Sequence, residues 1–214
     1  MFTIAPAAAI DIPELSSVMG AAFLHDTVTS GLLGSEIGRA TRAARLFRVM
    51  MRSGALRAGR VDMIRDSADG TIMGGAIWES PATSRLHLLH QAPQLPGFLR
   101  ALGKKGLFAA IWQQSLLRSY HPFEPHWYLA QIGVSERARG EGLGSALLEY
   151  RLQAVDALGM PVYLESSNAR NRALYERYGF TAIAAIQGLP TASPTAMWRP
   201  ARPARPGSWN PQLP

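Results

Sequence analysis

The stretch QIGVSERARGEGLGSALL, residues 131–148, decides the fold of this chain. An apolar run leads into a turn rich in arginine and glycine, and good helix formers follow the turn directly. Three glycines alternate with other residues in the turn: Gly140, Gly142 and Gly144. They leave the backbone free of side-chain bulk where the first turn of a helix has unpaired amide N–H groups. Such a helix start binds phosphate, to which Arg137 and Arg139 can add charge-assisted hydrogen bonds.

The composition is that of a globular protein. A chain of 214 residues, 47% hydrophobic and 17% charged, can bury one core, so we expect a single domain over residues 1–200. The proline-rich residues 201–214 are expected to form an extended or disordered tail. The absence of cysteine excludes disulfides and thiolate chemistry. No apolar run is long enough to span a bilayer and the start lacks the early positive charge of a signal peptide, so we expect a cytoplasmic protein.

Periodicity and turn signals predict the other elements. Strands are expected at residues 3–9, 60–64, 71–78, 126–134, 162–165, 180–187 and 195–199. Helices are expected at residues 12–23, 36–53, 107–120, 145–158 and 169–178, with Asp11 capping the first and Asn168 the last. Residues 25–35 are expected to form a loop. The second helix carries an arginine stripe, which indicates a solvated face or a surface for an acidic partner. The stripe consists of Arg39, Arg42, Arg45, Arg48 and Arg52.

A dinucleotide-binding unit shares this order of strand, glycine loop, helix and strand. In such a unit Gly140 and Gly142 would be the first two glycines, and Glu165 would hold a ribose. However, Ser145 stands in place of the third glycine. Residues 135–139 also separate the strand from the first glycine, whereas a dinucleotide turn must follow its strand at once. A P-loop is excluded because no Gly-Lys-Ser or Gly-Lys-Thr follows the glycines.

Two motifs in the same order resemble the GNAT superfamily of N-acetyltransferases. RGEGLG, residues 139–144, matches its pyrophosphate-binding motif, and NARNRALYERYGF, residues 168–180, is similar to the segment that follows in the family. HWYLAQIGV, YERYGF and TAMWRP look like the puromycin N-acetyltransferase branch. The resemblance implies an α/β (α+β) fold with a mixed, largely antiparallel sheet of six or seven strands. It also implies helices on both faces and a V-shaped splay between central strands.

The resemblance implies acetyl-CoA as cosubstrate. The pyrophosphate would be held by Arg139, Gly140, Gly142, Gly144 and Ser145. The acetyl-pantetheine arm would lie along Ile132, Gly133 and Val134, and the lower arm would contact Asn168 and Asn171. A glycine in the middle of a strand indicates a close approach of a ligand or of packed neighbours, and both explanations of Gly133 stay open.

For catalysis, the resemblance implies that Tyr175 is the general acid at the departing thiolate, because a phenol with a pKa of about 10 is protonated at neutral pH. The backbone N–H of Val134 would polarise the thioester carbonyl. Glu165, at the end of a strand, is the first choice of general base, with His126 and His25 as the other candidates. No cluster of His, Asp or Glu has metal-ligand spacing, so no metal is expected.

The predicted function is transfer of an acetyl group from acetyl-CoA to an amine of a small molecule, aminonucleoside antibiotics included, or of a peptide. Residues 25–35 and 86–120 are expected to bind the acceptor. The alternative is a non-catalytic acyl-CoA sensor on the same fold. Despite the net charge of +7, the basic residues are too sparse in the tail to predict a nucleic-acid partner. No membrane partner is expected, and the protein would be a monomer or a homodimer.

Overall fold

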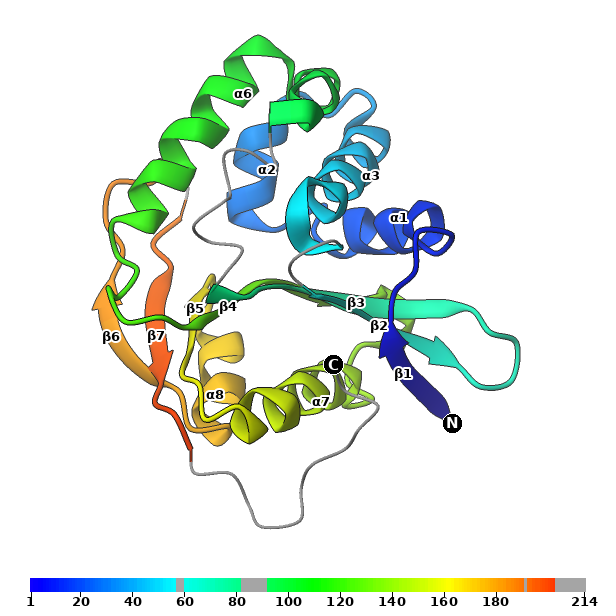
Figure 1. Cartoon of the computed structure of the whole chain (residues 1–214). Helices are drawn as coiled ribbons and strands as arrows, with labels where there is room; N and C mark the ends of the chain where they lie inside the picture. Colours follow the sequence, from blue (N-terminus) through cyan, green and yellow to red (C-terminus); the bar gives the residue numbers. More distant parts are fainter. Residues whose placement is uncertain (57–59, 82–91, 191, 203–214) are drawn as a thin grey trace.

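One mixed sheet runs through the molecule. The structure is a computed structural model that describes residues 1–56, 60–81, 92–190 and 192–202. The sheet has seven strands in the order β1-β2-β3-β4-β5-β7-β6, and every pair is antiparallel except β4 with β5 (Figure 1). The strands are β1 (Phe2–Pro6), β2 (Arg60–Asp66), β3 (Ile72–Glu79), β4 (Trp127–Val134), β5 (Val162–Ser166), β6 (Thr181–Ala185) and β7 (Thr195–Arg199). This confirms the predicted sheet.

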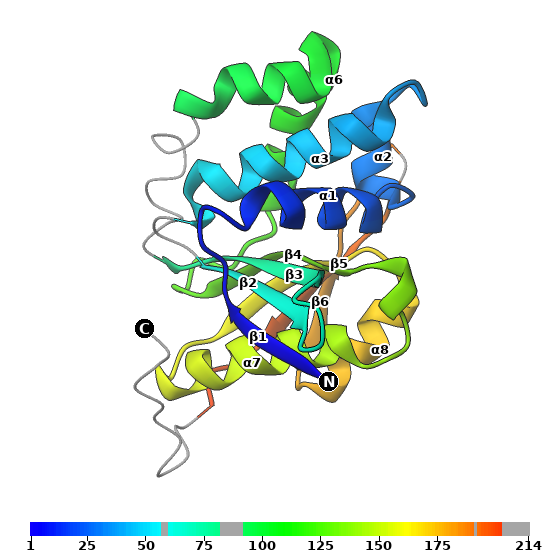
Figure 2. The same cartoon turned by 90° about the vertical axis from the view of Figure 1, so that its right-hand side faces the viewer.

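Helices cover both faces of the sheet, as predicted. One face carries α1 (Ile12–Ala22), α2 (Thr27–Leu33), α3 (Arg39–Met50) and α6 (Leu95–Arg118). The other face carries α7 (Leu143–Ala157) and α8 (Ala169–Arg177). Figure 1 and Figure 2 show these two helical layers from directions at right angles. Within the part of the chain that the structure describes, no helix combines the length and apolar character needed to cross a membrane.

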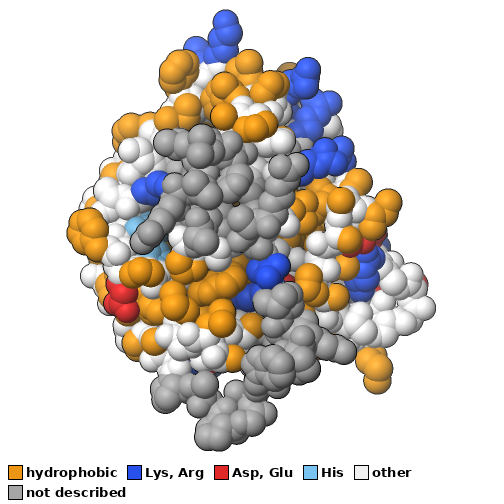
Figure 3. Space-filling model, viewed as in Figure 1, with side chains coloured by type: hydrophobic (Ala, Val, Ile, Leu, Met, Phe, Trp, Pro, Cys, Tyr) orange, Lys and Arg blue, Asp and Glu red, His pale blue; other side chains and the backbone are white. Residues whose placement is uncertain are grey.

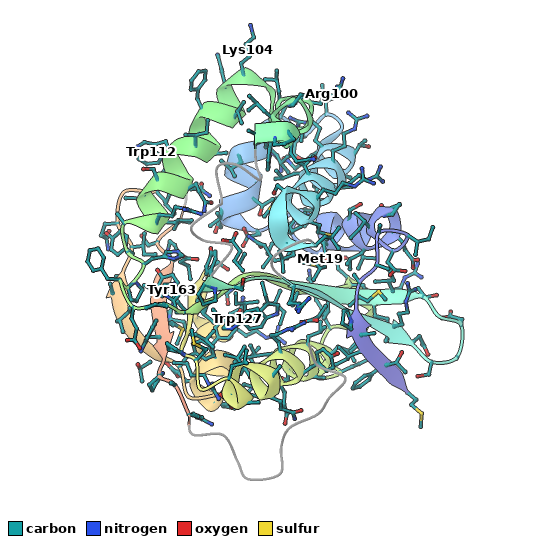
Figure 4. All side chains as sticks on the ribbon, in the orientation of Figure 1. Met19, Arg100, Lys104, Trp112, Trp127 and Tyr163 are labelled. Carbon is teal, nitrogen blue, oxygen red and sulfur yellow. The ribbon has the colours of Figure 1, made fainter. Side chains whose placement is uncertain are left out.

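The two layers bury separate hydrophobic cores. The helices α1, α2, α3 and α6 form the first layer. Met19 of α1 lies between this layer and the sheet, whereas Trp127 of β4 lies between the sheet and α7 (Figure 4). The core on the α1 side includes Ile12, Leu15, Met19, Phe47 and Ile77. The core on the α7 side includes Trp78, Leu129, Leu148, Leu164 and Phe180. Alternation of side chains along each strand supplies both cores at once, which is why the central strands read as almost continuously apolar.

The central strands β4 and β5 splay apart. They pair in parallel only at Trp127↔Val162, Tyr128↔Tyr163 and Leu129↔Leu164. Beyond that point β4 continues along β3 to Val134, while β5 follows β7 to Ser166. The register between β3 and β4 shifts from Ile77↔Gln131 to Trp78↔Leu129, so Ala130 is an extra residue in β4 at the start of the splay. This geometry is the V-shaped opening that the resemblance implies.

Helix α1 packs unusually close to the sheet at two glycines. A Cβ atom on Gly75 would lie 2.8 Å from Cδ1 of Leu15. A Cβ atom on Gly133 would lie 2.6 Å from Cε2 of Phe23, which follows α1. Both distances are shorter than ordinary Cβ contacts, so a larger residue at either position would force its neighbour to move. Close packing is therefore one physical reason for the mid-strand Gly133, independent of any ligand.

The sequence-based predictions fail at three places in the first layer. Residues 25–35 are not a plain loop, because Asp26 Oδ1 accepts hydrogen bonds from the N–H groups of Val28 (3.1 Å) and Thr29 (2.9 Å) and starts α2. Helix α6 begins at Leu95 rather than near 107, and a break at Gly103, whose φ is 67°, interrupts it. Asp11 does not cap α1. Its carboxylate instead pairs with Arg65 at 2.5 Å and accepts from the N–H of Ala8.

The arginine stripe of α3 is partly structural. Arg42 donates to the carbonyl oxygens of Leu33 (2.6 Å) and Ser35 (2.5 Å), and Arg39 pairs with Glu36 at 2.6 Å. These contacts hold the connection between α2 and α3. Arg45 and Arg52 are exposed. Figure 3 shows Lys and Arg side chains along the edge of the molecule that α3 forms, as expected of a solvated helix face.

Candidate active site

A cavity of about 210 Å³ opens where β4 and β5 splay. Its floor is the β4 segment from Tyr128 to Ile132, and its far wall comes from Phe23, which follows α1, and from α2, α3 and α6. On the side of β5 and α8 it is lined by Glu165, Ser167, Asn171 and Tyr175. The single cavity thus joins both predicted catalytic residues to the helical layer above the sheet. Part of the predicted acceptor region, residues 82–91, lies outside the described residues.

The glycine turn has the predicted geometry for an anion. Gly140 (φ 91°) and Gly142 (φ 80°) adopt the positive φ that favours glycine, and a Cβ on either would meet no atom within 4 Å. Gly142 precedes α7 without a side-chain cap, so the first amide groups of the helix point outward unpaired by side chains. Arg139 is exposed and lies 3.2 Å from Glu136. An open backbone at a helix start fits a pyrophosphate.

Asn168 has the predicted structural role. Its side-chain Oδ1 accepts a hydrogen bond from the N–H of Asn171 at 2.9 Å, which caps α8. Asn171 also lines the cavity. Ser145 lies in the first turn of α7, and its carbonyl oxygen accepts from the Tyr178 hydroxyl at 3.4 Å. The capping of α8 is therefore confirmed, while contact of these residues with a cosubstrate stays a prediction.

Tyr175 is placed as a proton donor would need to be. It is buried, its ring packs edge-on against Phe180 with centroids 5.8 Å apart, and it lines the cavity. Burial raises the pKa of the Tyr175 hydroxyl well above its usual value. The phenol is therefore protonated at every pH at which the protein would work.

Glu165 is a buried carboxylate with a polar neighbour at each oxygen. Its Oε2 accepts a hydrogen bond of 2.7 Å from the Tyr128 hydroxyl, and its Oε1 lies 3.2 Å from Nε2 of His121. The side chain is 8% exposed and lines the cavity. The burial and the charge of Glu165 raise the pKa of Tyr128 well above its ordinary value, so Tyr128 acts only as a donor. One oxygen is thus fixed by a hydrogen bond and the other faces His121, while the role of Glu165 as general base stays a prediction.

The three histidines outside residues 82–91 occupy different environments. His25 is exposed and lies outside the cavity lining, which makes it a poor candidate for the base. His126 is half-buried, and burial lowers its pKa. His121 was missed from the sequence, because it lies in a turn and meets Glu165 only through the fold. Because Glu165 is distant from His121 in the sequence, no local sequence pattern indicates that the two residues meet.

Glu79, at the end of β3, is a second acidic residue that the sequence did not single out. It lines the cavity, and burial raises its pKa, while Arg118 and His121 oppose the rise. Together with Asp26 and Glu165 it gives the cavity an acidic character. Within the described residues, no group of three or more His, Asp or Glu side chains could hold a metal ion.

Similar proteins share segments of this chain. It is 44% identical over 54 residues to an N-acetyltransferase of Schizosaccharomyces pombe named as uncharacterized, which is 25% of this chain and 22% of that protein. It is 45% identical over 64 residues to the mycothiol acetyltransferase of Beutenbergia cavernae, which is 28% of this chain and 22% of that protein. The chain therefore matches only about a fifth of the length of these two relatives.

Solved structures resemble the whole chain. The histone acetyltransferase HPA2 and related acetyltransferase of Corynebacterium glutamicum has a TM-score of 0.73 and 29% identity, over 95% of this chain and 99% of that one. The ribosomal-protein-S18-alanine N-acetyltransferase of Escherichia coli has a TM-score of 0.54 and 17% identity, over 98% and 100%, and so shares the fold alone. The sequence model of the acetyltransferase (GNAT) family matches residues 67–180, more than half of the chain. The chain therefore belongs to the acetyltransferase (GNAT) family.

Proposed function

We propose that this protein transfers an acetyl group from acetyl-CoA directly to an amine of a small molecule or a peptide. The observation that carries the proposal is the single cavity at the β4–β5 splay. It brings a protonated phenol, Tyr175, and a buried carboxylate, Glu165, to one space beside the edge of β4 that no longer pairs with β5. Acid, base and a polar backbone edge are what acetyl transfer to an amine requires.

The residues at the splay fit CoA. Gly140, Gly142, Gly144 and Ser145 would hold the pyrophosphate through backbone N–H groups at the start of α7, with Arg139 free to leave its exposed partner Glu136. The backbone of Ile132, Gly133 and Val134 continues beyond the last β4–β5 pair and would bind the pantetheine arm. Asn168 and Asn171, at the start of α8, would contact its lower part. When bound, acetyl-CoA would supply the acetyl group as a reactive thioester.

The side chains then have two proton tasks. As the amine nitrogen bonds to the acetyl carbon, it must lose a proton, which Glu165 would accept directly or through water. As the bond from carbon to sulfur breaks, Tyr175 would give its proton to the departing thiolate and regain one from solvent. The backbone N–H of Val134 would donate to the carbonyl oxygen and stabilise its developing charge. One proton is lost at nitrogen and one is gained at sulfur, so the transfer balances.

The cavity favours an amine with an apolar body. Its helical wall is mostly apolar, and its polar residues include three acids. The apolar side chains include those of Phe23, Leu46, Phe47, Met50, Phe98 and Leu102. Asp26, Glu79 and Glu165 would attract a protonated amine. Aminonucleosides of the puromycin type stay candidates within this class.

The second candidate is a non-catalytic acyl-CoA sensor on the same fold. Retention of an acid and a base in one cavity favours the enzyme. The sensor would bind acetyl-CoA tightly yet release no free CoA with any amine.

Replacing Tyr175 with Phe tests the acid directly. The variant keeps the ring that packs on Phe180 and removes only the hydroxyl. We expect kcat for the acceptor to fall by about 100-fold, because general acid catalysis contributes on this order. The dissociation constant of acetyl-CoA, measured by calorimetry, should change by less than about twofold. Wild-type turnover in Tyr175→Phe would contradict the assignment of Tyr175.

A further inference from the structure

We propose that His121 shares with Glu165 the proton taken from the amine, and that His126 fixes the ring of His121 in the tautomer that makes this possible. His121 is thus a positioning residue that acts through Glu165. The inference rests on the proposed function, and it follows from a chain of contacts that runs from the cavity to an exposed turn.

Three contacts form the chain. Glu165 Oε1 lies 3.2 Å from His121 Nε2. Nδ1 of His121 lies 3.3 Å from Nε2 of His126. Nδ1 of His126 lies 2.6 Å from the backbone carbonyl oxygen of Glu124. The two imidazole rings also pack against each other, with centroids 5.4 Å apart, so their orientation is held by both contacts.

The backbone carbonyl oxygen of Glu124, at one end of this series of contacts, determines which ring nitrogens carry protons. A carbonyl only accepts, so Nδ1 of His126 carries a proton and donates it. His126 is neutral, in keeping with the burial that lowers its pKa, and its Nε2 is therefore an acceptor. Nδ1 of His121 must then be the donor between the rings. This leaves Nε2 of His121 facing Glu165 Oε1 with no proton assigned to either atom.

A hydrogen bond between Nε2 of His121 and Oε1 of Glu165 requires one further proton. Without it, two acceptors would face each other 3.2 Å apart in a buried setting, which is unfavourable. With it, the pair is an imidazolium and a carboxylate, because an ordinary imidazole binds a proton more tightly than an ordinary carboxylate does. Under the proposal, the Glu165–His121 pair therefore takes up one proton as a unit, and that proton rests on the imidazole rather than on the carboxylate.

This property matches the chemical task. A lone glutamate with a pKa of about 4.3 is a weak base toward an amine, whereas catalysis favours a base that is poised near the working pH. In the proposed step, the proton leaves the amine nitrogen for Glu165 and comes to rest on Nε2 of His121. It returns to solvent before the next turnover. Glu165 is the catalytic group that faces the amine, and His121 sets its strength.

The groups around the pair support this distribution of charge. Tyr128 donates to the other oxygen of Glu165 and cannot take up the proton. The Tyr163 ring lies 4.4 Å from the His121 ring, and burial, followed by the charge of Glu165, raises its pKa above the usual range. Glu79 on β3 attracts an imidazolium, while Arg118 at the end of α6 offsets that attraction.

The two histidines border a hollow of their own. This hollow, of about 130 Å³, is lined by His121, His126 and Arg118 and shares Glu79, Gln114 and Tyr128 with the larger cavity. The side chain of His121 is 18% exposed. The pair can therefore exchange its proton with water on the side away from Tyr175 and the CoA arm.

Kinetics with His121→Gln and the control variant Glu149→Gln test the role of His121. Glutamine at position 121 can still donate to Glu165 but cannot bind the proton. We expect His121→Gln to lower kcat by 10- to 100-fold, to leave KM for acetyl-CoA unchanged, and to move the acidic limb of the kcat/KM profile to lower pH. Glu149→Gln, at an exposed position of α7 outside the cavity, should match the wild type. An acidic limb at the wild-type pH in His121→Gln would overturn the proposal.

Chemical rescue separates a chemical role from a structural one. In His121→Gly, added imidazole should restore at least a tenth of the wild-type turnover, because the hollow can admit the ring. Pyrrole, which has nearly the same shape but is not basic, should restore none. Equal rescue by both molecules, or by neither, would contradict a shared proton.

Nuclear magnetic resonance of ¹⁵N-histidine protein gives a readout that needs no activity. At a pH below the acidic limb of the kcat/KM profile both ring nitrogens of His121 should be protonated, and above that limb, where the pair is free to accept the proton of the amine, Nε2 should have lost its proton. His126 should carry a proton on Nδ1 alone throughout. In Glu165→Gln, Nε2 of His121 should lose its proton at a lower pH than in the wild type. A non-protonated Nε2 below the acidic limb in the wild type, or the same midpoint in Glu165→Gln, would overturn the shared proton. If the wild type acetylates no amine, the proposed function fails, but this measurement still decides the state of the pair.

Discussion

The two ends of the candidate site are built in different ways. The backbone end, formed by the turn before α7 and the last residues of β4, presents glycines with positive φ, uncapped amides at a helix start, and a strand that no longer pairs with β5. The cavity end presents side chains that come from separate elements, among them α2, α3 and α6. The backbone end thus depends on local chain geometry, and the cavity end on how the helices α2, α3 and α6 pack. We therefore propose that specificity for the acceptor depends on the cavity end.

The largest expected effect is at the backbone end. Gly142→Asp places a carboxylate where the pyrophosphate would lie, and a like charge at a binding site costs several kcal/mol. We expect CoA affinity, measured by calorimetry, to fall roughly a thousand-fold with folding unchanged. Gly159→Asp is the matched control, because Gly159 also has a positive φ of 62° and open space at its Cβ. Wild-type CoA affinity in Gly142→Asp would break the comparison.

The next effect concerns the buried ion pair that joins β2 of the sheet to α7. Asp62 of β2 and Arg151 of α7 form a buried bidentate pair beneath the sheet, with 2.9 Å between Arg151 Nε and Asp62 Oδ2. Asp62→Asn leaves the guanidinium buried without a countercharge, which should cost about 3–5 kcal/mol in the free energy of unfolding. Urea denaturation measures this loss. The control Glu149→Gln changes an exposed acid of α7 and should cost less than about 0.5 kcal/mol.

The smallest effect sharpens the role of Gly133. The methyl group of Gly133→Ala would press on Phe23, so we expect a loss of about 1–3 kcal/mol in the free energy of unfolding. Phe23→Leu in the same chain should recover part of that loss. Gly144→Ala, where the new methyl meets no atom within 4 Å, should not destabilise the protein. If Gly133→Ala keeps full stability and loses only CoA affinity, Gly133 serves the ligand rather than the packing.

The same difference explains how much the sequence could predict. All seven strands were predicted, as were α7 and α8, because alternation, glycine stops and the cap at Asn168 act over a few residues. The positive φ angles of Gly140 and Gly142 fit the predicted open turn, while its binding of a pyrophosphate stays a prediction. Tyr175 was placed by the family motif and Glu165 by its position at a strand end; the fold brings both to one cavity, and their catalytic roles stay predictions.

The rest depends on contacts between distant segments. The start of α2 was missed because the glycines around it suggested a loop, although Asp26 caps it. The extent of α6 was missed because Gly103 breaks the helix without ending it. His121 lies outside every predicted strand and helix, and only the pairing of β4 with β5 brings it to Glu165. Such juxtapositions carry no local periodicity, so sequence patterns cannot report them.

Acetyl transfer itself is the most direct test of the central claim. Purified protein would be incubated with acetyl-CoA and, one at a time, arylalkylamines, aminonucleosides, polyamines, amino acids and peptides with free N-termini. Free CoA would be measured with a thiol reagent, and the acceptor by mass spectrometry. We predict that at least one amine with an apolar body gains one acetyl group for each CoA released, and that Tyr175→Phe abolishes most of this gain. Tight binding of acetyl-CoA without release of CoA by any amine would contradict the claim.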